Sequence, residues 1–360
     1  MGPSARATHR RWLASLTDLP TASGREQTVT AWVLAWADRR GFRASLDEAG
    51  NVLVRSRQRS RRRPLMAMAH MDHPALVVLE AEAKEAKAEL RGGVLASYID
   101  GARIELATSV GTMPGRVLDF DPATGIARIA VTGATSGDIA RWHFPPGRLG
   151  FRNGRLAARA CDDLAGAAAG LVALDAATAR GLHHFSVLLT RAEEVGFVGA
   201  VAAAKLGTIP DGARVLSIEC SPASADAPLG AGPVVRVGDA ASIFSAELTN
   251  RVSTLLRSSG LDHQRKLMAG GSCEATALAA LGVNATGLCL PLANHHNMVD
   301  MAAVRAGTRK ARLAPEEIDL GDFWGLVDLL LAVAEGLDQQ KQTLPFSLED
   351  IYANQRHLLV

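Results

Sequence analysis

The sequence contains no long run of apolar residues. No apolar stretch reaches the roughly 18 residues that a membrane-spanning helix requires. The N-terminal segment MGPSARATHRRWLASLTDLP also lacks the continuous apolar region and the small-residue cleavage site of a secretory signal. We therefore expect a cytoplasmic protein that does not bind membranes.

Neither sign of charge predominates. The 39 basic and 37 acidic residues leave a net charge of only +2. A chain with so small a net charge has no global field that would attract nucleic acid. We therefore expect no nucleic-acid partner, and a small neutral substrate such as a peptide is compatible with this balance.

Cysteine is scarce, and its spacing excludes two classes of protein. The four cysteines lie far apart in the sequence, at Cys161, Cys220, Cys273 and Cys289. They form neither the CxxC pairs of a zinc ribbon nor the dense pattern of a secreted disulfide scaffold. We expect them to be reduced thiols.

What the chain does have is the composition and length of a globular protein with two domains. Hydrophobic residues make up 48% and charged residues 21%, and no long polar low-complexity tract is present. At 360 residues the chain is too long for one small core, since domains usually contain about 100–200 residues.

The first seventy residues predict one helix and two strands. QTVTAWVLAWADRR has apolar residues at helical spacing, with a capping box at Ser23 and Glu26 and a stop at Gly41. NVLVR and PLMAMAH read as strands. Six of the nine residues from Arg55 to Arg63 are arginine. Two interpretations are open: contact with phosphate or an acidic partner, and a solvated loop between two strands. We favour the loop, because the run has no interleaved aromatic residues and no partner patch.

The remainder divides into a β-rich segment and an alternating segment. Residues 75–154 contain short β-prone runs broken by Gly, Pro and Asp, which predicts a small inserted β domain. From Ala160 onward strands and helices alternate, which favours an α/β layer with parallel strands. The expected helices are at 162–180, 196–206, 274–281 and 317–337, and the expected strands at 185–190, 213–219 and 286–291.

Acidic and imidazole side chains follow several of these strands. His70 ends PLMAMAH, with Asp72 two residues on, and Glu193 and Glu194 follow FSVLLTRA. Open α/β sheets bind their ligands at the carboxyl ends of the strands. Two adjacent carboxylates near a buried strand repel one another unless a cation or a shared proton compensates them. A lone histidine at a strand end is usually structural, so His70 carries weight only in combination.

Three further elements supply groups of the same kind. Asp162 and Asp163 precede a helix, where capping is the ordinary role of an aspartate. Glu219 ends the strand VLSIE, and His295 and His296 lie in the loop after TGLCLP. Together these oxygen and nitrogen ligands are of the kind that bind zinc, cobalt or manganese.

The motif order resembles that of the dinuclear-metal exopeptidases. H-x-D, D-D-x-x-G and E-E-x-G are followed by a carboxylate after an apolar strand and by a late histidine. The β-rich insertion between the first two motifs most resembles the tetrahedral and glutamyl aminopeptidase family, over about residues 20–335. The related deacetylases and carboxypeptidases place their extra domain after the E-E motif.

The resemblance implies a fold and a domain division. The fold is α/β, a three-layer mixed sheet with helices on both faces, as in zinc exopeptidases, plus a small inserted β domain. The implied division is a catalytic domain of residues 1–74 and 155–340, the inserted domain of residues 75–154, and a C-terminal tail of residues 341–360.

The resemblance also implies roles for individual residues. Two divalent metal ions, Zn²⁺ or else Co²⁺ or Mn²⁺, would share Asp162. The ligands of one ion would be His70 and Glu219, and those of the other Glu194 and His296.

The remaining implied roles surround these ligands. Glu193 would be the general base, Asp72 would support His70, and Asp163 would flank the bridging aspartate. His296 fits the late motif better than His295, because a hydrophobic residue and an acid follow it at the right spacing.

Two positions depart from the family pattern. Glu219 stands where the family usually has aspartate, which offers the same ligand atoms on a shorter arm. GGSCEAT stands where the family has an acidic turn. Glu274 in this segment would contact a substrate amino group, or would simply begin the following helix near its positive end.

These motifs and the resemblance predict a metal-dependent aminopeptidase that acts on peptides through metal-activated water. The resemblance alone implies that it forms homo-oligomers. Two alternatives remain. An N-acyl amino acid deacylase would use the same site but accept N-blocked substrates. A non-catalytic relic retained for binding would have no need of a general base at Glu193.

Overall fold

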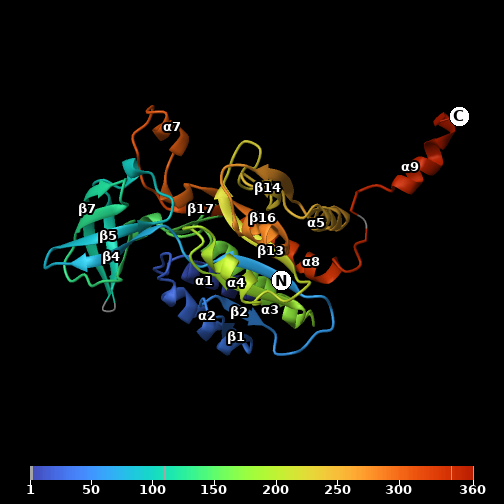
Figure 1. Ribbon diagram of the computed structural model, residues 1–360, viewed down its shortest axis with the longest axis horizontal. Coiled ribbons are helices and arrows are strands. Elements are labelled where there is room, and N and C mark those ends of the chain that lie inside the picture. The colour runs from blue at the N-terminus through green and yellow to red at the C-terminus, as the bar shows by residue number, and fades with distance from the viewer. Residues whose placement is uncertain (1–2, 109–110, 342, 360) are drawn as a thin grey trace.

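Helices cover both faces of a mixed β-sheet, and a small β-barrel projects from one end of the molecule (Figure 1). The computed structural model describes residues 3–108, 111–341 and 343–359. Within these residues, no helix is long and apolar enough to cross a bilayer.

Four parallel strands form the centre of the sheet. They lie in the order β12 (Phe185–Thr190), β3 (Leu65–His70), β13 (Arg214–Pro222) and β16 (Asn284–Ala293). Every residue of β3 is buried, as expected for a strand that has helices on both faces. Because the four strands run in the same direction, their carboxyl ends meet at one edge of the sheet.

Antiparallel strands extend the sheet on both sides. Beyond β12 it continues through β2 to β1, and beyond β16 through β17 and β11 to β10, while β14 and β15 branch from β16. The bounds are β1 Arg43–Leu46, β2 Val52–Arg55, β10 Gly150–Arg152, β11 Arg155–Ala158, β14 Val234–Asp239, β15 Gln264–Met268 and β17 Glu316–Asp319.

One face of the sheet carries the larger core. Its central helix, α3 (Leu164–Ala179), is rich in alanine and glycine and is buried along most of its length. Small side chains let this helix lie close to the strands. Four more helices complete this layer: α1 Pro3–Leu16, α2 Gln27–Arg40, α5 Ala246–Ser258 and α8 Leu320–Gly336.

The opposite face is covered by α4 (Val198–Lys205) and α6 (Glu274–Ala280). Alternate residues of β12 enter the two cores, with Val187 on the α3 side and Leu188 on the α4 side. Period-two alternation of this kind is what a strand buried on both faces provides. The three-layer α/β fold expected from the sequence is confirmed.

The β-rich segment closes into a barrel with its own apolar core. The strands follow one another in the order β4-β5-β8-β7-β6-β9. The interior contains Leu76, Ile104, Ile129 and Trp142, all buried. The bounds are β4 Ala75–Ala81, β5 Glu85–Arg91, β6 Arg103–Thr108, β7 Gly111–Asp121, β8 Ile126–Ala130 and β9 Ile139–Trp142.

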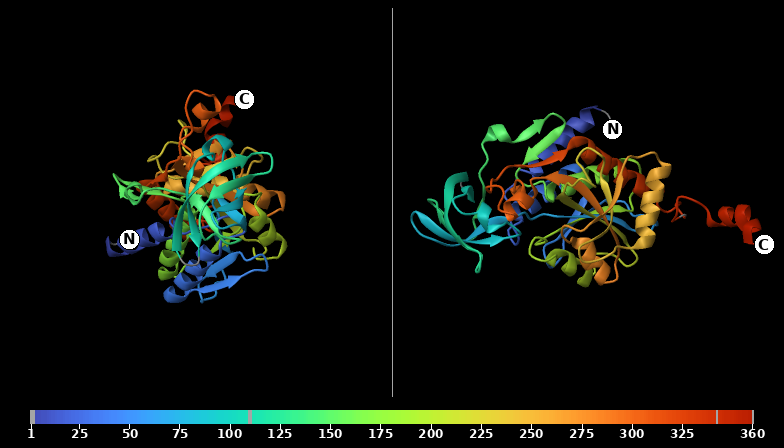
Figure 2. Two further views of the ribbon diagram at one scale, coloured as in Figure 1. Left: turned by 90° about the vertical axis from the view of Figure 1, so that its left-hand side faces the viewer. Right: turned by 90° about the horizontal axis from the view of Figure 1, so that it is seen from above.

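The expected C-terminal tail, residues 341–360, contains a short helix, α9 (Leu348–Gln355). This helix lies away from the body, at the end of the molecule opposite the barrel (Figure 2). Its residues are exposed. Residues 342 and 360 of the expected tail lie outside the described part of the chain, as do residues 1–2 and 109–110 of the other two expected domains.

Three local predictions are wrong. The helix expected at 317–337 begins only at Leu320, because residues 316–319 form the strand β17. Ser23 does not cap α2, because its hydroxyl donates to the Asp72 carboxylate at 2.6 Å, and Glu26 accepts backbone hydrogen bonds from Gly24 and Ala192. Glu219 is not the last residue of its strand, since β13 continues to Pro222 alongside β16. Tertiary partners override the local pattern in all three cases. Gly41 does end α2, in the left-handed conformation.

Candidate metal centre

Parallel pairing brings the predicted site residues to one edge of the sheet. His70, the last residue of β3, is paired with Thr190, the last residue of β12. Glu193 and Glu194 follow three and four residues later. On the other side of β3 the parallel register with β13 runs to Met68 and Ser217. Two residues beyond that pair, the same register places Glu219 level with His70.

Asp162 lies at the centre of the cluster, and its two carboxylate oxygens face different partners. Oδ1 lies 3.3 Å from Nε2 of His70. Oδ2 lies 3.4 Å from Nε2 of His296 and 3.1 Å from Nε2 of His295. Asp162 is 1% exposed. Each oxygen of this carboxylate faces a different set of histidines. A carboxylate that is to be shared between two metal ions needs this arrangement.

Glu194 and Glu219 complete the two sides of this arrangement. Glu194 Oε1 lies 3.1 Å from His296 Nε2. Glu219 Oε2 lies 3.9 Å from His70 Nε2. The structure therefore brings together the five residues predicted as ligands, on the two sides of Asp162 that the sequence predicts for them.

Glu193 faces His70 from the next element. Its Oε2 lies 4.0 Å from His70 Nε2, and its side chain retains a small exposed surface. A carboxylate that borders both the ligand cluster and solvent can exchange protons with a bound substrate or water.

Asp72 connects the two halves of this edge. Its Oδ1 lies 3.4 Å from Nδ1 of His70 and accepts a hydrogen bond from the Glu193 amide at 3.0 Å. Oδ2 accepts from the Glu194 amide at 3.1 Å and from Ser23 at 2.6 Å. His70 Nδ1 donates to the backbone carbonyl of Asp72 at 3.1 Å. Asp72 therefore orients the imidazole through its carbonyl and its nearby carboxylate, and the carboxylate also fixes the backbone of both glutamates. The sequence predicted the first of these contacts but not the second.

Asp163 does not cap α3. No hydrogen bond joins its side chain to the first turn of the helix. Its oxygens instead lie against Gly166, where a Cβ atom would stand 2.2 Å from Oδ1 and 2.6 Å from Cγ2 of Ile218. Asp163 is fully buried beside Asp162. It flanks the central aspartate as predicted, and glycine at position 166 provides the space for it.

His295 and His296 stack on each other, with ring centroids 3.7 Å apart. Only His296 also reaches Glu194, and its Nδ1 donates to the carbonyl of Gly93 at 2.7 Å. A hydrogen bond at Nδ1 leaves Nε2 as the nitrogen that is free to bind a metal. This geometry favours His296 as the ligand and places His295 beside it on Asp162.

Two groups that hold the site in place were not predicted from the sequence. The first, Glu316 in β17, is fully buried and accepts hydrogen bonds from the amides of Cys161 at 2.7 Å, Asp162 at 3.0 Å and His296 at 2.7 Å. A single carboxylate thus positions the backbone of the central aspartate and of the late histidine. The adjacent acids at 316 and 317 were the only sequence signal for this role.

The second, His73, follows the H-x-D motif directly. Its Nδ1 lies 2.7 Å from the carbonyl oxygen of Asp162, and its Nε2 lies 3.2 Å from Oδ1 of Asn297. His73 therefore joins the loop after β3 to the loops that carry the central aspartate and the late histidine.

Glu274, predicted to contact a substrate amine or to begin a helix, is the first residue of α6 and is fully buried. Burial raises its pKa to about 7. Its contact with substrate stays a prediction.

Burial and mutual interaction shift the pKa values of the cluster in opposite directions. Burial opposes the charged form of His70, yet the carboxylates of Asp162 and Asp72 raise its pKa well above the usual value. His295, His296 and His70 overcome the effect of burial on Asp162 and lower its pKa well below the usual range. Burial, together with the charge of Glu194, raises the pKa of Glu193. The protein alone therefore compensates the charge of Asp162 but not that of Glu193.

The donor atoms fit divalent metal ions. Four buried atoms of the cluster form no hydrogen bond within the described residues: His70 Nε2, Asp162 Oδ1, Glu194 Oε1 and Glu219 Oε2. Buried polar atoms without partners are costly, and a cation that accepts their lone pairs removes that cost. Asp162 belongs to two groups of three side chains, and within each group the ligand atoms lie within 4.8 Å of one another: one group adds His295 and His296, and the other His70 and Glu194. Glu194 is therefore close to both His70 and His296, whereas Glu219 belongs to neither group and is connected to the site through its 3.9 Å approach to His70.

Comparison with known families gives one match. The model of the M42 glutamyl aminopeptidase family matches residues 127–313, just over half of the chain. This range contains Asp162, both glutamates of the E-E motif, Glu219 and His296. No curated protein matches the chain by sequence.

Several solved structures share the fold. An aminopeptidase from the archaeon Desulfurococcus kamchatkensis is 23% identical, with 94% of this chain and 98% of that chain covered and a TM-score of 0.72. A TET aminopeptidase from a marine sediment thaumarchaeote is 19% identical, with 92% and 97% covered and a TM-score of 0.73. The TET1 peptidase of Pyrococcus horikoshii, described as assembling into a tetrahedron or a large octahedral shell, is 22% identical, with 91% and 99% covered and a TM-score of 0.70.

Proposed function

This chain belongs to the M42 glutamyl aminopeptidase family, and from that premise we propose how its residues perform metal-dependent removal of N-terminal residues from peptides. The enzyme is a peptide hydrolase. The observation that carries the proposal is the sharing of Asp162 between two groups of ligand atoms at the carboxyl edge of the sheet.

We assign Asp162 as the ligand shared by two divalent ions. His70 and Glu219 would complete one ion's protein ligands, and Glu194 and His296 the other's. Oxygen and imidazole donors of this kind suit zinc, and also cobalt or manganese. Bound at this edge, such ions would lower the pKa of a bound water molecule and polarise the peptide carbonyl.

Glu193 would carry the proton that the reaction moves. Its carboxylate would accept a proton from the attacking water and return it to the nitrogen of the leaving amine. The hydrogen bond from its amide to Asp72 fixes the segment that presents this side chain. Because Asp72 also faces His70, base and ligand are positioned by the same group.

The test is release of free amino acids from matched peptides with free and acetylated N-termini. The protein is chelated and then reloaded with zinc, cobalt or manganese before each assay. We expect cleavage only of unblocked peptides, restored by metal. Equal or faster cleavage of N-acetylated substrates would move the protein to the deacylases, and metal binding without turnover of either set would indicate a non-catalytic relic.

We further propose that the chain forms homo-oligomers. The related PhTET1-12s structure is described as a dodecamer. The shared fold supports a similar assembly here, and light scattering checks it. A mass well above the 37.9 kDa of one chain is expected, and a monomer at all concentrations would contradict the proposal.

The domain division and the location also remain proposals. Residues 75–154 would form the inserted domain. A barrel with a separate apolar core supports this for residues 75–142, whereas β10 within the range pairs with β11 in the main sheet. Residues 1–74 and 155–340 would form the catalytic domain. All four cysteines are buried and unpaired, which supports a reducing, cytoplasmic compartment.

A further inference from the structure

The arginine-rich loop between β2 and β3 lies beside a pocket, and the catalytic cluster does not use it. The pocket has a volume of about 380 Å³, within the roughly 300–1,000 Å³ usual for ligand sites. Five of its lining residues are arginines: Arg43, Arg55, Arg57, Arg59 and Arg62. None of the lining residues is acidic.

The floor of this pocket is a row of side chains across three strands. Arg55 of β2 stands directly opposite Arg43 of β1 and directly opposite Ser186 of β12. Directly opposed residues of antiparallel strands point to the same face, about 4.5–5.5 Å apart at Cβ, and like charges so placed are destabilising. Two arginines therefore face one another where a salt bridge would be expected.

Within the described residues, protein groups do not relieve this repulsion. The side chains of Arg43, Arg55 and Arg59 are exposed and form no hydrogen bond or ion pair with these residues. Arg57 donates only to the carbonyl of Gly41, at 3.1 Å. Only Arg62 has an acidic partner, Asp338, at 2.8 Å. The pocket thus holds four guanidinium charges without counter-ions from the protein.

The loop is anchored at its end and not loosely solvated along its whole length. Arg62 also donates to the carbonyls of Ala334 and Glu335, at 3.0 and 3.3 Å, which ties the loop to the end of α8. At its start, Ser56 is hydrogen-bonded to His183 across the pocket at 2.9 Å. These contacts hold the intervening arginines over the floor.

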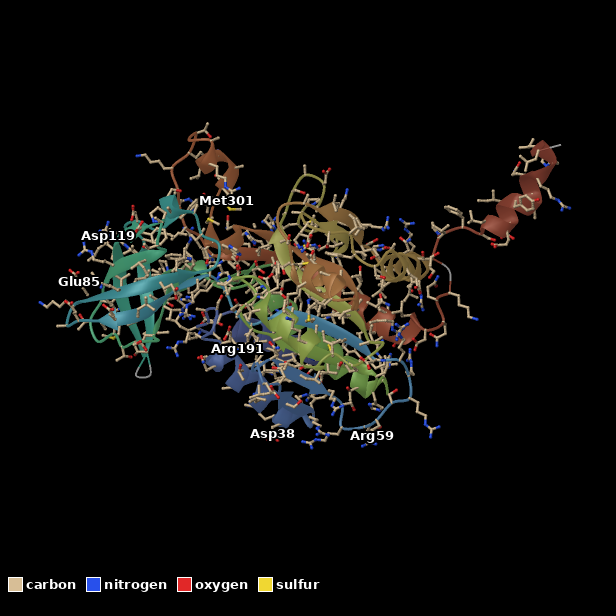
Figure 3. The ribbon with its side chains drawn as sticks, viewed as in Figure 1. Asp38, Arg59, Glu85, Asp119, Arg191 and Met301 are labelled. Atoms are coloured by element: carbon tan, nitrogen blue, oxygen red, sulfur yellow. The ribbon has the colours of Figure 1, made fainter. Side chains whose placement is uncertain are left out.

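The pocket lies at the opposite end of the strands from the metal ligands. Met66 and Ser186, near the starts of β3 and β12, line it, whereas His70 and Thr190 end those strands at the catalytic edge. In Figure 3, Arg59 on this loop and Arg191, just after β12, mark the two ends. A ligand here would not contact the reacting peptide.

We propose that this pocket, lined by Arg43, Arg55, Arg57 and Arg59, is a binding site for a short polyphosphate group. Guanidinium groups bind phosphate oxygens through paired, charge-assisted hydrogen bonds. Ser60, whose hydroxyl oxygen accepts from the Arg62 amide, adds a hydroxyl donor to the lining. A polyphosphate chain brings several negative charges into a small volume, which matches four uncompensated cations better than a single carboxylate does.

The lining also indicates which part of a phosphate-bearing ligand is recognised. It contains no Phe, Tyr or Trp side chain on which a nucleobase would stack. Free tripolyphosphate and a nucleoside triphosphate should therefore bind through the same phosphate chemistry. A nucleic acid, which such sites usually hold by stacking as well as charge, is the less favoured occupant.

The test is calorimetric titration of the full-length, metal-loaded protein with tripolyphosphate, at a constant ionic strength of about 0.15 M. We expect saturable binding of one equivalent per chain, and no tighter binding of adenosine triphosphate. Replacing Arg43, Arg55 and Arg59 together by alanine should weaken binding by at least about tenfold, because charge-assisted hydrogen bonds are lost.

The control variant removes the same net charge elsewhere. Lys84, Arg305 and Lys310 are exposed and lie outside the pocket, and their combined replacement by alanine should leave the affinity unchanged. If the triple arginine variant does not fold, the single variant Arg59→Glu replaces it and should also weaken tripolyphosphate binding. The side chain of Arg59 is exposed and has no partner among the described residues. Peptide cleavage should persist in all variants that fold.

Three results would overturn the proposal. The first is absence of saturable tripolyphosphate binding to the wild-type protein. The second is equal weakening in the control variant, which would show general attraction to surface charge. The third is binding of duplex DNA in strong preference to tripolyphosphate, with a steep salt dependence, which would identify a nucleic-acid surface.

Discussion

Individual carboxylates at this site differ in function because they differ in partners. Asp162 faces three imidazoles, Asp72 faces an imidazole and two amides, and Glu316 accepts only amide hydrogen bonds. Only the first is placed to bind two ions. The other two determine where Asp162, His70 and His296 stand.

Glu316→Gln tests this division of roles. The amide would present an N–H₂ group to backbone donors, so the segments that carry Asp162 and His296 should shift. Changes to groups that orient ligands typically cost about 10–100-fold in metal affinity. We expect a loss in this range, measured by competition with a chelator. Glu317→Gln, at the neighbouring half-exposed position, is the matched control. Unchanged metal affinity in Glu316→Gln would contradict the assignment.

The sequence predicts the residues of the cluster and one residue that holds it, Asp72, but neither Glu316 nor His73. His70, Asp162, Glu194, Glu219 and His296 follow strands or precede a helix, and parallel pairing brings such positions together. Glu316 has no comparable signal, because its three partners lie on segments about 20 and 155 residues away in the chain. The role of a buried carboxylate that accepts only amide hydrogen bonds can be recognised from the three-dimensional structure, but not from the sequence.

At the scale of elements, the burial of α3 depends on the small size of its residues. Gly166→Ala should destabilise the protein by about 1–3 kcal/mol, since the new methyl group would overlap Asp163 and Ile218. Gly170→Ala, one turn further along the same helix, meets Val187 only at 3.4 Å. Because alanine favours helix, that control should be neutral or stabilising by up to about 1 kcal/mol. Urea unfolding of the two variants decides between these outcomes.

A second prediction at this scale concerns the residue before β12. Burial, with the nearby charge of Arg62, lowers the pKa of His184 to about 4. Its usual pKa is about 6.5, so below that pH the unfolded chain takes up a proton that the folded chain does not. Stability should therefore fall between about pH 6.5 and 4, by up to about 2 kcal/mol at pH 5.

The variant His184→Asn should remove this component. Urea unfolding at pH 7 and pH 5, on metal-free protein, provides the measurement. The control is His357→Asn. His357 is exposed and lies in η4, the 3₁₀ turn Arg356–Leu359 after α9. The same pH dependence in His184→Asn as in wild type would show that another group is responsible.

Elements with strong periodicity were predictable, and those built by tertiary pairing were not. The strand at Phe185–Thr190 has the predicted bounds. In contrast, β17 has the sequence EEID and becomes a strand because it pairs with β11 and β16 on either side. The helix at Ala246–Ser258 lies in a stretch for which no element is predicted from the sequence. Acidic edge strands carry little local signal.

At the scale of the whole molecule, the barrel and the tail lie at opposite ends of the catalytic body (Figure 2). Removal of residues 346–360 should leave peptide cleavage and the thermal midpoint unchanged within about 2 °C, because this segment is largely exposed. Differential scanning calorimetry and the peptide assay check this. A large fall in the midpoint would show that the tail packs in solution against the body or against another subunit.

The central claim is that Glu193 moves the proton while other residues hold the ions. Its most direct test is metal content and peptide turnover of Glu193→Gln beside wild type. We predict that the variant retains two ions per chain and that kcat falls by about 10²–10⁴-fold, the usual contribution of a general base. Loss of an ion from the variant, or turnover close to that of wild type with both ions bound, would contradict the account.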